Sequence, residues 1–266
     1  MRQTSTTISE PVQPTVCKVC LFLADYSSWL LGCGATCIRM EKNMKRIAGA
    51  YGMEVETTIM PRHIHMSVWR PNTDERYTYI AAVSHCSIDF SINTRLSELS
   101  WEIADKRISF ENAQDKFEKI IHSPKSNPWI VLLLVTIANA SFCRLFGGDA
   151  MAMAVVGMAT FGGFFLKQRL LARKIDLRVV VTLCAFVSTI LGATDMLFHL
   201  GTTPSIAIAT SVLYLVPGIP FLNSFSDVLY KHYICAYSRF VDTVVLTGCL
   251  SIGLCCGMAV MNAGMF

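Results

Sequence analysis

The sequence predicts an α-helical membrane protein, with five transmembrane helices preceded by a small cytoplasmic α+β domain. Charge is unevenly distributed: residues 1–127 carry 15 Lys/Arg and 14 Asp/Glu, whereas residues 128–266 carry 8 Lys/Arg, 5 Asp and no Glu. Pro128–Phe146 is an apolar run about as long as a helix needs to cross the hydrocarbon core of a bilayer. Because backbone groups in lipid must bond internally, such a run is expected to be helical.

Composition excludes two classes of protein. A net charge of +4, scattered along the chain, argues against nucleic-acid binding. Eleven cysteines, several of them in apolar runs, indicate reduced thiols that pack as small apolar groups rather than a disulfide framework. We expect residues 1–14 to be a disordered tail, residues 15–127 the α+β domain and residues 128–266 the membrane domain.

The α+β domain is expected to begin with an amphipathic helix over Thr15–Leu31, which Gly32-Cys33-Gly34 interrupts. A second helix follows, with Thr36 as its cap and Gly52 at its end. Alternating apolar residues then predict strands around residues 53–59, 64–68 and 76–83. Two apolar stripes at helical spacing predict two more helices: Ile92, Leu96, Leu99 and Ile103, and then Phe110, Ala113, Phe117, Ile120 and Ile121.

Five spans fit the remainder: Pro128–Phe146, Ala150–Leu166, about Leu177–Leu200, about Pro204–Phe225 and about Asp242–Met265. Basic residues gather in two connections, those after the second and the fourth span: Lys167, Arg169, Arg173, Lys174, Arg178, Lys231 and Arg239. The opposite side has Arg144 alone. Basic loops stay in the cytoplasm, so we expect a cytoplasmic N-terminal domain and an external C-terminus.

The middle of the fourth span reads Val216-Pro217-Gly218-Ile219-Pro220. Two prolines remove backbone donors and Gly218 loosens the chain, so a straight helix is not expected. Either the break exposes half-helix ends, which bind anions at their N-termini, or it is a kink that neighbouring groups repair. The polar cluster that follows favours function: Asn223 would bind the substrate with Pro217, Gly218 and Pro220, and Asp227 would carry a coupling proton or act as a gate.

Ionisable side chains within spans are costly and are therefore functional candidates. Asp195, late in the third span, is either a coupling or gating group or a carboxylate that reaches interfacial water. Arg144 either binds a substrate carboxylate bidentately or extends to the membrane surface. Asn139 and Ser141 are best explained by hydrogen bonds between helices, and Asp149 by capping of the second span.

No metal site, cofactor or catalytic centre is expected. Cys17-x-x-Cys20 and Cys33-x3-Cys37 loosely resemble zinc spacings, but both pairs fall in predicted helices, where such spacing only places side chains on one face. His63 and His65 share a strand face without a third ligand. Because no phosphate loop or nucleophile motif occurs in the sequence, we do not expect an enzyme.

The chain resembles the threonine/serine exporter family from about Val16 to Met265. The residues that carry the resemblance are Gly32-Cys33-Gly34-Ala35-Thr36, Asn93, Phe146-Gly147-Gly148-Asp149, Pro204-Ser205, Leu215-Val216-Pro217-Gly218-Ile219-Pro220, Asn223 and Asp227. Single-chain members of the family are similar to two fused five-helix halves, whereas this chain matches only the first half. The resemblance therefore implies the large subunit of the split form, which pairs with a small multi-span membrane protein and is associated with the export of dicarboxylates such as succinate.

The leading hypothesis is thus a subunit of a secondary transporter that exports a small carboxylate across the inner membrane as a hetero-oligomer. The alternative hypothesis for the substrate is threonine or serine. A membrane-anchored sensor or regulatory scaffold is the alternative from another class. The Pro-Gly-x-Pro break beside Asn223 and Asp227 favours transport, since an anchor needs no such break.

The basic residues in the connections between spans predict the orientation of the chain in the membrane. A reporter that is active only in the cytoplasm should be active when fused before Met1 and inactive when fused after Phe266. The opposite pattern of reporter activity would overturn the orientation.

Overall fold

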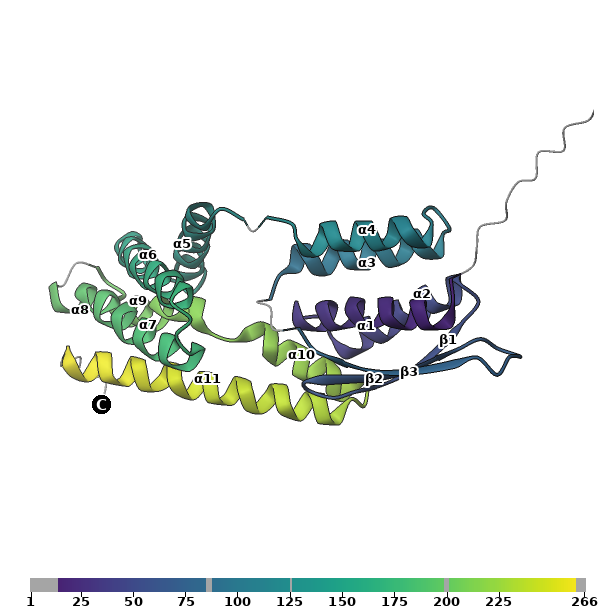
Figure 1. Cartoon of the computed structure of the whole chain (residues 1–266). Helices are drawn as coiled ribbons and strands as arrows, with labels where there is room; N and C mark the ends of the chain where they lie inside the picture. Colours follow the sequence, from purple (N-terminus) through teal and green to yellow (C-terminus); the bar gives the residue numbers. More distant parts are fainter. Residues whose placement is uncertain (1–13, 85–87, 125, 199–200, 262–266) are drawn as a thin grey trace, which may run out of the picture. The chain divides into compact units, whose positions relative to one another are not determined.

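The computed structural model describes residues 14–84, 88–124, 126–198 and 201–261. The tail predicted for residues 1–14 lies outside this part, apart from Pro14. Most of the described chain is helical, with a small sheet near the N-terminus (Figure 1). It forms two compact units, namely the residues up to Ser123 with Ile219–Arg239, and Pro124–Gly218 with the residues from Phe240 onward. The domain boundaries expected from the sequence stay a prediction.

The first unit contains four helices that follow the predicted stripes: α1 (Val16–Gly32), α2 (Cys37–Ala50), α3 (Phe90–Ala104) and α4 (Phe110–Ile121). The Thr15 and Thr36 side chains accept bonds from Lys18 N and Arg39 N, which caps α1 and α2. Between these helices Gly34 has φ +91°, a conformation that favours glycine. The predicted break and cap in this loop are therefore confirmed.

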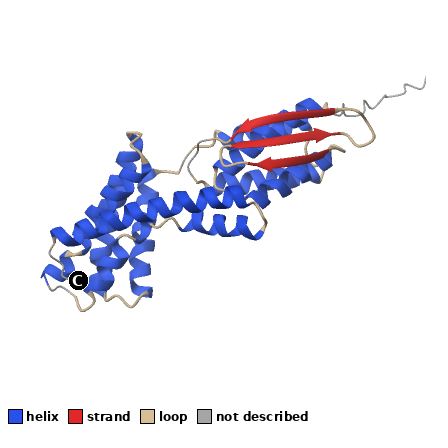
Figure 2. Ribbon diagram, turned by 90° about the horizontal axis from the view of Figure 1, so that it is seen from below, coloured by secondary structure: helices blue, strands red, loops and turns tan. Residues whose placement is uncertain are grey.

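The sheet of the described chain has the order β1-β2-β3 and is antiparallel: β1 (Glu54–Ile59), β2 (His63–Trp69) and β3 (Arg76–Ala82). Helices cover one face and leave the other open (Figure 2). The burial pattern agrees, since Val55, Ile64, Met66 and Val68 are buried while alternate residues are more exposed. The α+β architecture predicted for this part of the chain is confirmed.

The core of the first unit contains a buried polar group, the Tyr26 hydroxyl, which joins three helices. Tyr26 is fully buried, and its hydroxyl donates to Leu96 O at 2.8 Å and accepts from Asn43 Nδ2 at 3.0 Å. Next to it, the Arg46 guanidinium stacks 3.6 Å from the centre of the Trp101 ring. These contacts hold α1, α2 and α3 together, so the α1–α2 loop starts from a rigid base.

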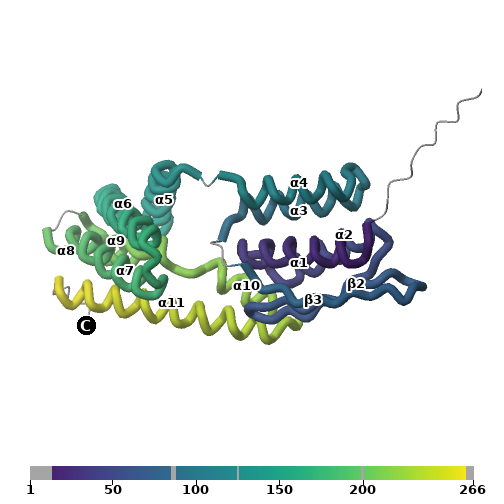
Figure 3. Tube along the Cα trace, in the orientation of Figure 1, coloured from purple at the N-terminus to yellow at the C-terminus, as the bar shows by residue number. Residues whose placement is uncertain are grey.

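The second unit is a helical bundle that contains α5 (Pro128–Leu145), α6 (Ala150–Ala172), α7 (Leu177–Gly192), α8 (Thr194–Phe198), α9 (Pro204–Ser211) and the 3-10 turn η1 (Leu213–Leu215). The two remaining helices are α10 (Gly218–Leu229) and α11 (Tyr233–Val260). The chain trace shows α11 as one continuous helix (Figure 3). Its first residues, up to Arg239, belong to the first unit.

Among the described residues, four helices are long and apolar enough to cross a membrane: α5, α6, Leu177–Phe198 and α11. The interrupted pair Pro204–Leu215 and Gly218–Leu229 makes a fifth if the pair is one span. Large apolar side chains on α5 are exposed, among them Leu134 and Ile137 at 61% and 62%. Such a surface suits lipid rather than water.

Two predicted boundaries are corrected. α11 begins at Tyr233 rather than near Asp242, so Arg239 lies inside a helix and not in a connection. α6 continues to Ala172, which places Lys167 and Arg169 in its last turns. In both places charged side chains interrupt the hydropathy pattern without interrupting the backbone, because Lys and Arg are good helix formers.

Glycines allow close packing between helices inside the bundle. A Cβ on Gly163 in α6 would collide with the Ser188 and Tyr214 side chains. On α11, a Cβ on Gly257 would lie 2.8 Å from Thr189 Cβ. These close approaches join helices of the same chain.

Replacing Gly163 by Ala should lower the thermal denaturation midpoint of the purified chain in detergent. The added methyl group overpacks the contact with Ser188 and Tyr214, which typically costs about 1–3 kcal/mol. Gly157→Ala in the same helix is the matched control, because its Cβ would meet only ordinary contacts at 3.9 and 4.0 Å. Equal midpoints for the two variants would contradict the packing.

Candidate functional site

Two of the polar residues predicted as functional, Asn223 and Asp227, lie on α10, directly after an interruption of the helix. The 3-10 turn η1 ends at Leu215, Val216 is extended, and α10 begins at Gly218. The predicted interruption of the helix is confirmed at Val216 and Pro217, whereas Gly218, Ile219 and Pro220, which were expected to depart from regular helix as well, lie in α10. Gly218 is exposed, and a Cβ placed on it would meet no atom within 4 Å. Pro220 lies in the first turn of α10, where proline is tolerated because its N–H would be unpaired anyway.

Within the first unit, α10 binds the α1–α2 loop through polar side chains. Asn223 Nδ2 donates to the Gly34 carbonyl oxygen at 2.8 Å. One turn further along α10, Asp227 is completely buried. The two residues that the sequence singled out on this helix thus face the same loop, residues Gly34–Cys37.

Asp227 is held by donors from two other helices. Its Oδ1 accepts from the Cys37 backbone N–H at 3.0 Å, at the N-terminus of α2, where a negative charge is favourable. Its Oδ2 accepts from Arg239 Nη1 of α11 at 2.7 Å. A buried carboxylate is stable only when paired and hydrogen-bonded, and Asp227 meets both conditions.

Arg239 and Cys37 complete the cluster. Arg239 also donates through Nη2 to the Ala35 carbonyl oxygen at 3.0 Å, so one guanidinium joins α11 to the loop and to α10. A hydrogen bond with Cys235, together with burial, raises the pKa of the Cys37 thiol. The neutral thiol is therefore a donor, 3.4 Å from Asp227 Oδ2. We name this cluster of Cys37, Asn223, Asp227 and Arg239 the loop clamp.

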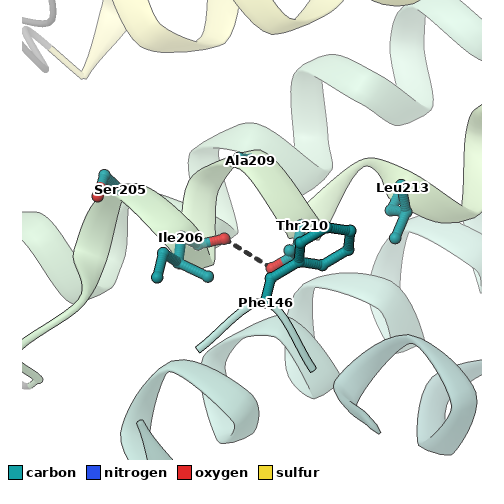
Figure 4. Close-up of a pocket in the computed structure, with 6 residues that line it drawn as sticks. All are labelled: Phe146, Ser205, Ile206, Ala209, Thr210 and Leu213. Carbon is teal, nitrogen blue, oxygen red and sulfur yellow. Dashed lines mark hydrogen bonds between the residues drawn. The ribbon is translucent and has the colours of Figure 1, made fainter. Parts of the chain in front are cut away.

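The second unit has a polar contact between helices and a pocket, and Thr210 belongs to both. Asn139 in α5 donates to Thr160 Oγ1 at 2.6 Å and to the Thr210 carbonyl oxygen at 3.1 Å, the helix-to-helix role predicted for it. The other side of Thr210 faces a pocket of about 420 Å³ lined by Phe146, Ser205, Ile206, Ala209, Thr210 and Leu213 (Figure 4). Thr210 Oγ1 bonds Ile206 O at 2.7 Å, so the lining offers few unused polar groups.

The remaining predicted residues lie in this unit. Arg144 is exposed in the last turn of α5 and donates from Nη1 to the Gly148 carbonyl oxygen at 3.1 Å. Asp149 caps α6 as expected, with its Oδ1 2.7 Å from Ala152 N. Asp195 lies in α8 and is completely buried, so its alternative as a water-exposed interfacial carboxylate is wrong in this structure.

Sequence reasoning missed two members of the loop clamp. Cys37 was weighed only as a metal ligand, and Arg239 was counted as a loop residue. The described residues contain no group of three or more His, Cys, Asp or Glu side chains that could hold a metal ion. The described cysteines form no disulfide, which agrees with the expected reduced thiols.

Comparisons with known proteins point to the same family as the sequence resemblance. A family model described as a putative threonine/serine exporter matches residues 21–261. A protein of Klebsiella aerogenes named "probable succinate transporter subunit YjjP" is 28% identical over 249 residues, covering 92% of this chain and 94% of the relative. A protein of the same name from Escherichia coli K12 is 25% identical over 245 residues, covering 91% and 93%. No solved structure matches the chain at a significant level.

Replacing Asp227 by Asn should destabilise the chain strongly. The change removes the charge that Arg239 and the α2 N-terminus require, and the loss of one partner from a buried pair costs about 3–5 kcal/mol. We expect a clearly lower thermal denaturation midpoint in detergent. Glu102→Gln is the matched control, because its pair with Lys116 is partly exposed and such pairs contribute only about 0–1 kcal/mol. A midpoint for Asp227→Asn equal to that of the control would contradict the loop clamp.

Proposed function

The chain belongs to the threonine/serine exporter family, and we propose that it is one subunit of a secondary transporter that exports a small carboxylate. A dicarboxylate such as succinate is the proposed substrate. Its support is the name of the two relatives, "probable succinate transporter subunit", with which this chain aligns over more than nine-tenths of its length. No enzymatic step is part of the proposal.

The observation that carries this proposal is the interruption of an apolar segment at Val216 and Pro217, directly before the polar face of α10. Broken membrane helices are used by transporters to offer backbone groups to a substrate, whereas a continuous helix has none to offer. We assign Pro217, Gly218 and Pro220 to substrate binding. The exposure of Gly218 and the free space beside it support this assignment.

Two polar side chains, one in each unit, are proposed as substrate ligands. The Asn223 amide uses one donor on Gly34 O, and in the described structure its second N–H makes no bond. We propose that this second N–H binds a substrate carboxylate. Arg144 is the proposed cationic ligand, since it is exposed and forms no ion pair within the described residues.

We propose a gating role for Asp227. Both of its oxygens already accept bonds from Cys37 and Arg239, which leaves little place for a transported proton. Its release from the loop clamp would instead free α10 from the α1–α2 loop. Asp195 is the better coupling candidate, because its burial is not accompanied by hydrogen bonds among the described residues.

The proposed setting is the inner membrane, with the N-terminal domain in the cytoplasm and the C-terminus outside. The distribution of basic residues along the chain supports this orientation. We further propose that the chain works as a hetero-oligomer with a small multi-span membrane subunit. The word "subunit" in the names of its relatives supports a second component.

The test is flux in liposomes reconstituted with the chain and its partner, using labelled succinate, threonine and serine in separate vesicles. We expect carboxylate flux from the pair and none from either subunit alone. Arg144→Gln should reduce succinate flux, because it removes the proposed cationic ligand and leaves the loop clamp intact. The matched control is Arg173→Gln, an exposed basic residue after α6.

Three results would contradict the proposal in different ways. Robust flux from this chain alone would remove the need for a partner. Flux of threonine and serine without succinate would replace the substrate. An unchanged succinate flux in Arg144→Gln would remove Arg144 from the site.

A further inference from the structure

Two acidic residues meet at one end of the second unit, where the α5–α6 turn contacts the segment before α9. Asp149 N donates to Thr203 Oγ1 at 3.0 Å. Asp149 Oδ2 accepts from the backbone N–H and the hydroxyl of Thr202, at 2.6 and 2.9 Å. These bonds fix the Asp149 carboxylate against the Gly201–Thr203 segment.

Asp195 reaches the same place from α8. A Cβ added to Gly201 would lie 3.0 Å from Asp195 Oδ1, and 2.8 and 3.0 Å from the two oxygens of Asp149. Since oxygens of both carboxylates lie within 3.0 Å of one point, they are no more than twice that distance apart. Three carboxylate oxygens thus converge on the open side of Gly201.

Asp195 differs from Asp149 in having no hydrogen-bond partner. It is completely buried, and neither of its oxygens is bonded within the part of the chain that the structure describes. A buried polar group without a partner is rare and costs free energy, and a buried charge costs far more. The described part of the chain therefore supplies no ligand for Asp195.

The charged groups on the described elements next to α8 do not supply it either. α8 packs against α6, α7 and α9. α9 has no titratable side chain, and those of α7, Arg178 and Cys184, lie in its first half. α6 carries Lys167 and Arg169 in its last turns, at the end away from its cap Asp149.

Three further titratable side chains lie on neighbouring elements. Arg144 is exposed, and its guanidinium donates to Gly148 O rather than to a carboxylate. On α11, whose Met258 packs with Ala193 between α7 and α8, Cys255 and Cys256 are exposed.

The two carboxylates have unequal roles. Hydrogen bonds from the Ala152 and Thr202 backbone N–H groups hold the pKa of Asp149 below its usual range. Asp149 is therefore the permanent negative charge. A second negative charge on Asp195, at such a short distance and away from water, would be strongly unfavourable without a cation between them.

We propose that Asp195 and Asp149 form the binding site for the small monovalent cation, a proton or a sodium ion, that drives export. This inference rests on the proposed transport function. The shared chemistry is a positive charge that neutralises the Asp195 carboxylate beside Asp149. Gly201 is required because any side chain there would fill the space onto which the oxygens open.

The test measures cation binding without transport. Dicyclohexylcarbodiimide adds to a protonated carboxyl group in apolar surroundings, and the modified residue is found by mass spectrometry of the purified full chain. We expect labelling of Asp195 that falls with rising pH, by about tenfold per pH unit once the carboxyl group loses its proton. If the cation is sodium, added sodium chloride at fixed pH should slow labelling several-fold, whereas potassium chloride should not.

Variants separate the site from general effects. Asp195→Asn should abolish labelling at this position, and Asp176→Asn, which alters an exposed capping carboxylate of α7, should leave it unchanged. Gly201→Ala retains both carboxylates and should change the labelling rate several-fold, so the proposal stays testable if Asp195→Asn does not fold.

Labelling of Asp195 that ignores both pH and sodium, or no labelling of Asp195 at any pH, would overturn the cation site. Neither result bears on carboxylate export, which is measured separately in liposomes. Cation-sensitive labelling in a protein that exports no carboxylate would leave the site standing and overturn the proposed function alone.

Discussion

A single buried carboxylate organises the first unit. Asp227, in the last turn of α10, connects this helix to the N-terminus of α2, 190 residues away in the sequence, and to the first turns of α11, 12 residues away. Burial makes the Asp227–Arg239 pair costly to form and still more costly to break. The Asp227–Arg239 pair also fixes the position of the α1–α2 loop, because Arg239 binds the Ala35 carbonyl oxygen. Asn223, one turn before Asp227 on α10, binds the Gly34 carbonyl oxygen. The glycine at position 34, with φ +91°, lets the loop present these carbonyl oxygens.

The second unit follows another physical rule, in which small residues let helices approach and a few polar groups join them. Gly163 and Gly257 allow contacts that any side chain would prevent, and Asn139 crosses from α5 to Thr160 and Thr210. Against this apolar background, a buried carboxylate without a partner stands out. Asp195 is such a group as far as the described residues go, and it lies beside Gly201, where the Asp149 carboxylate also binds Thr202. The cation site that we propose would give this cost a physical role.

Local patterns predicted much of the fold. The apolar stripes, the Thr36 cap and the alternation in the strands depend on neighbours a few residues apart, and the structure confirms them. The break at Pro217 was predictable because proline acts on its own backbone. The partners of Asp227 were not: Cys37 lies 190 residues away and follows no repeating pattern with it. Arg239 was misplaced for a related reason, since hydropathy marks where apolar residues are and not where a helix begins. Asp195 was recognised as costly, but its burial and its approach to Asp149 are tertiary facts.

The most direct test of the account is hydrogen exchange at the Cys37 amide, which donates to Asp227 Oδ1. Peptides that cover the start of α2 should exchange slowly in the wild-type chain. In Asp227→Asn, exchange there should become markedly faster, while peptides from α4, which has no contact with the loop clamp among its described hydrogen bonds, should keep their rates. Unchanged protection of the Cys37 amide in Asp227→Asn would contradict the claim that this carboxylate holds the loop.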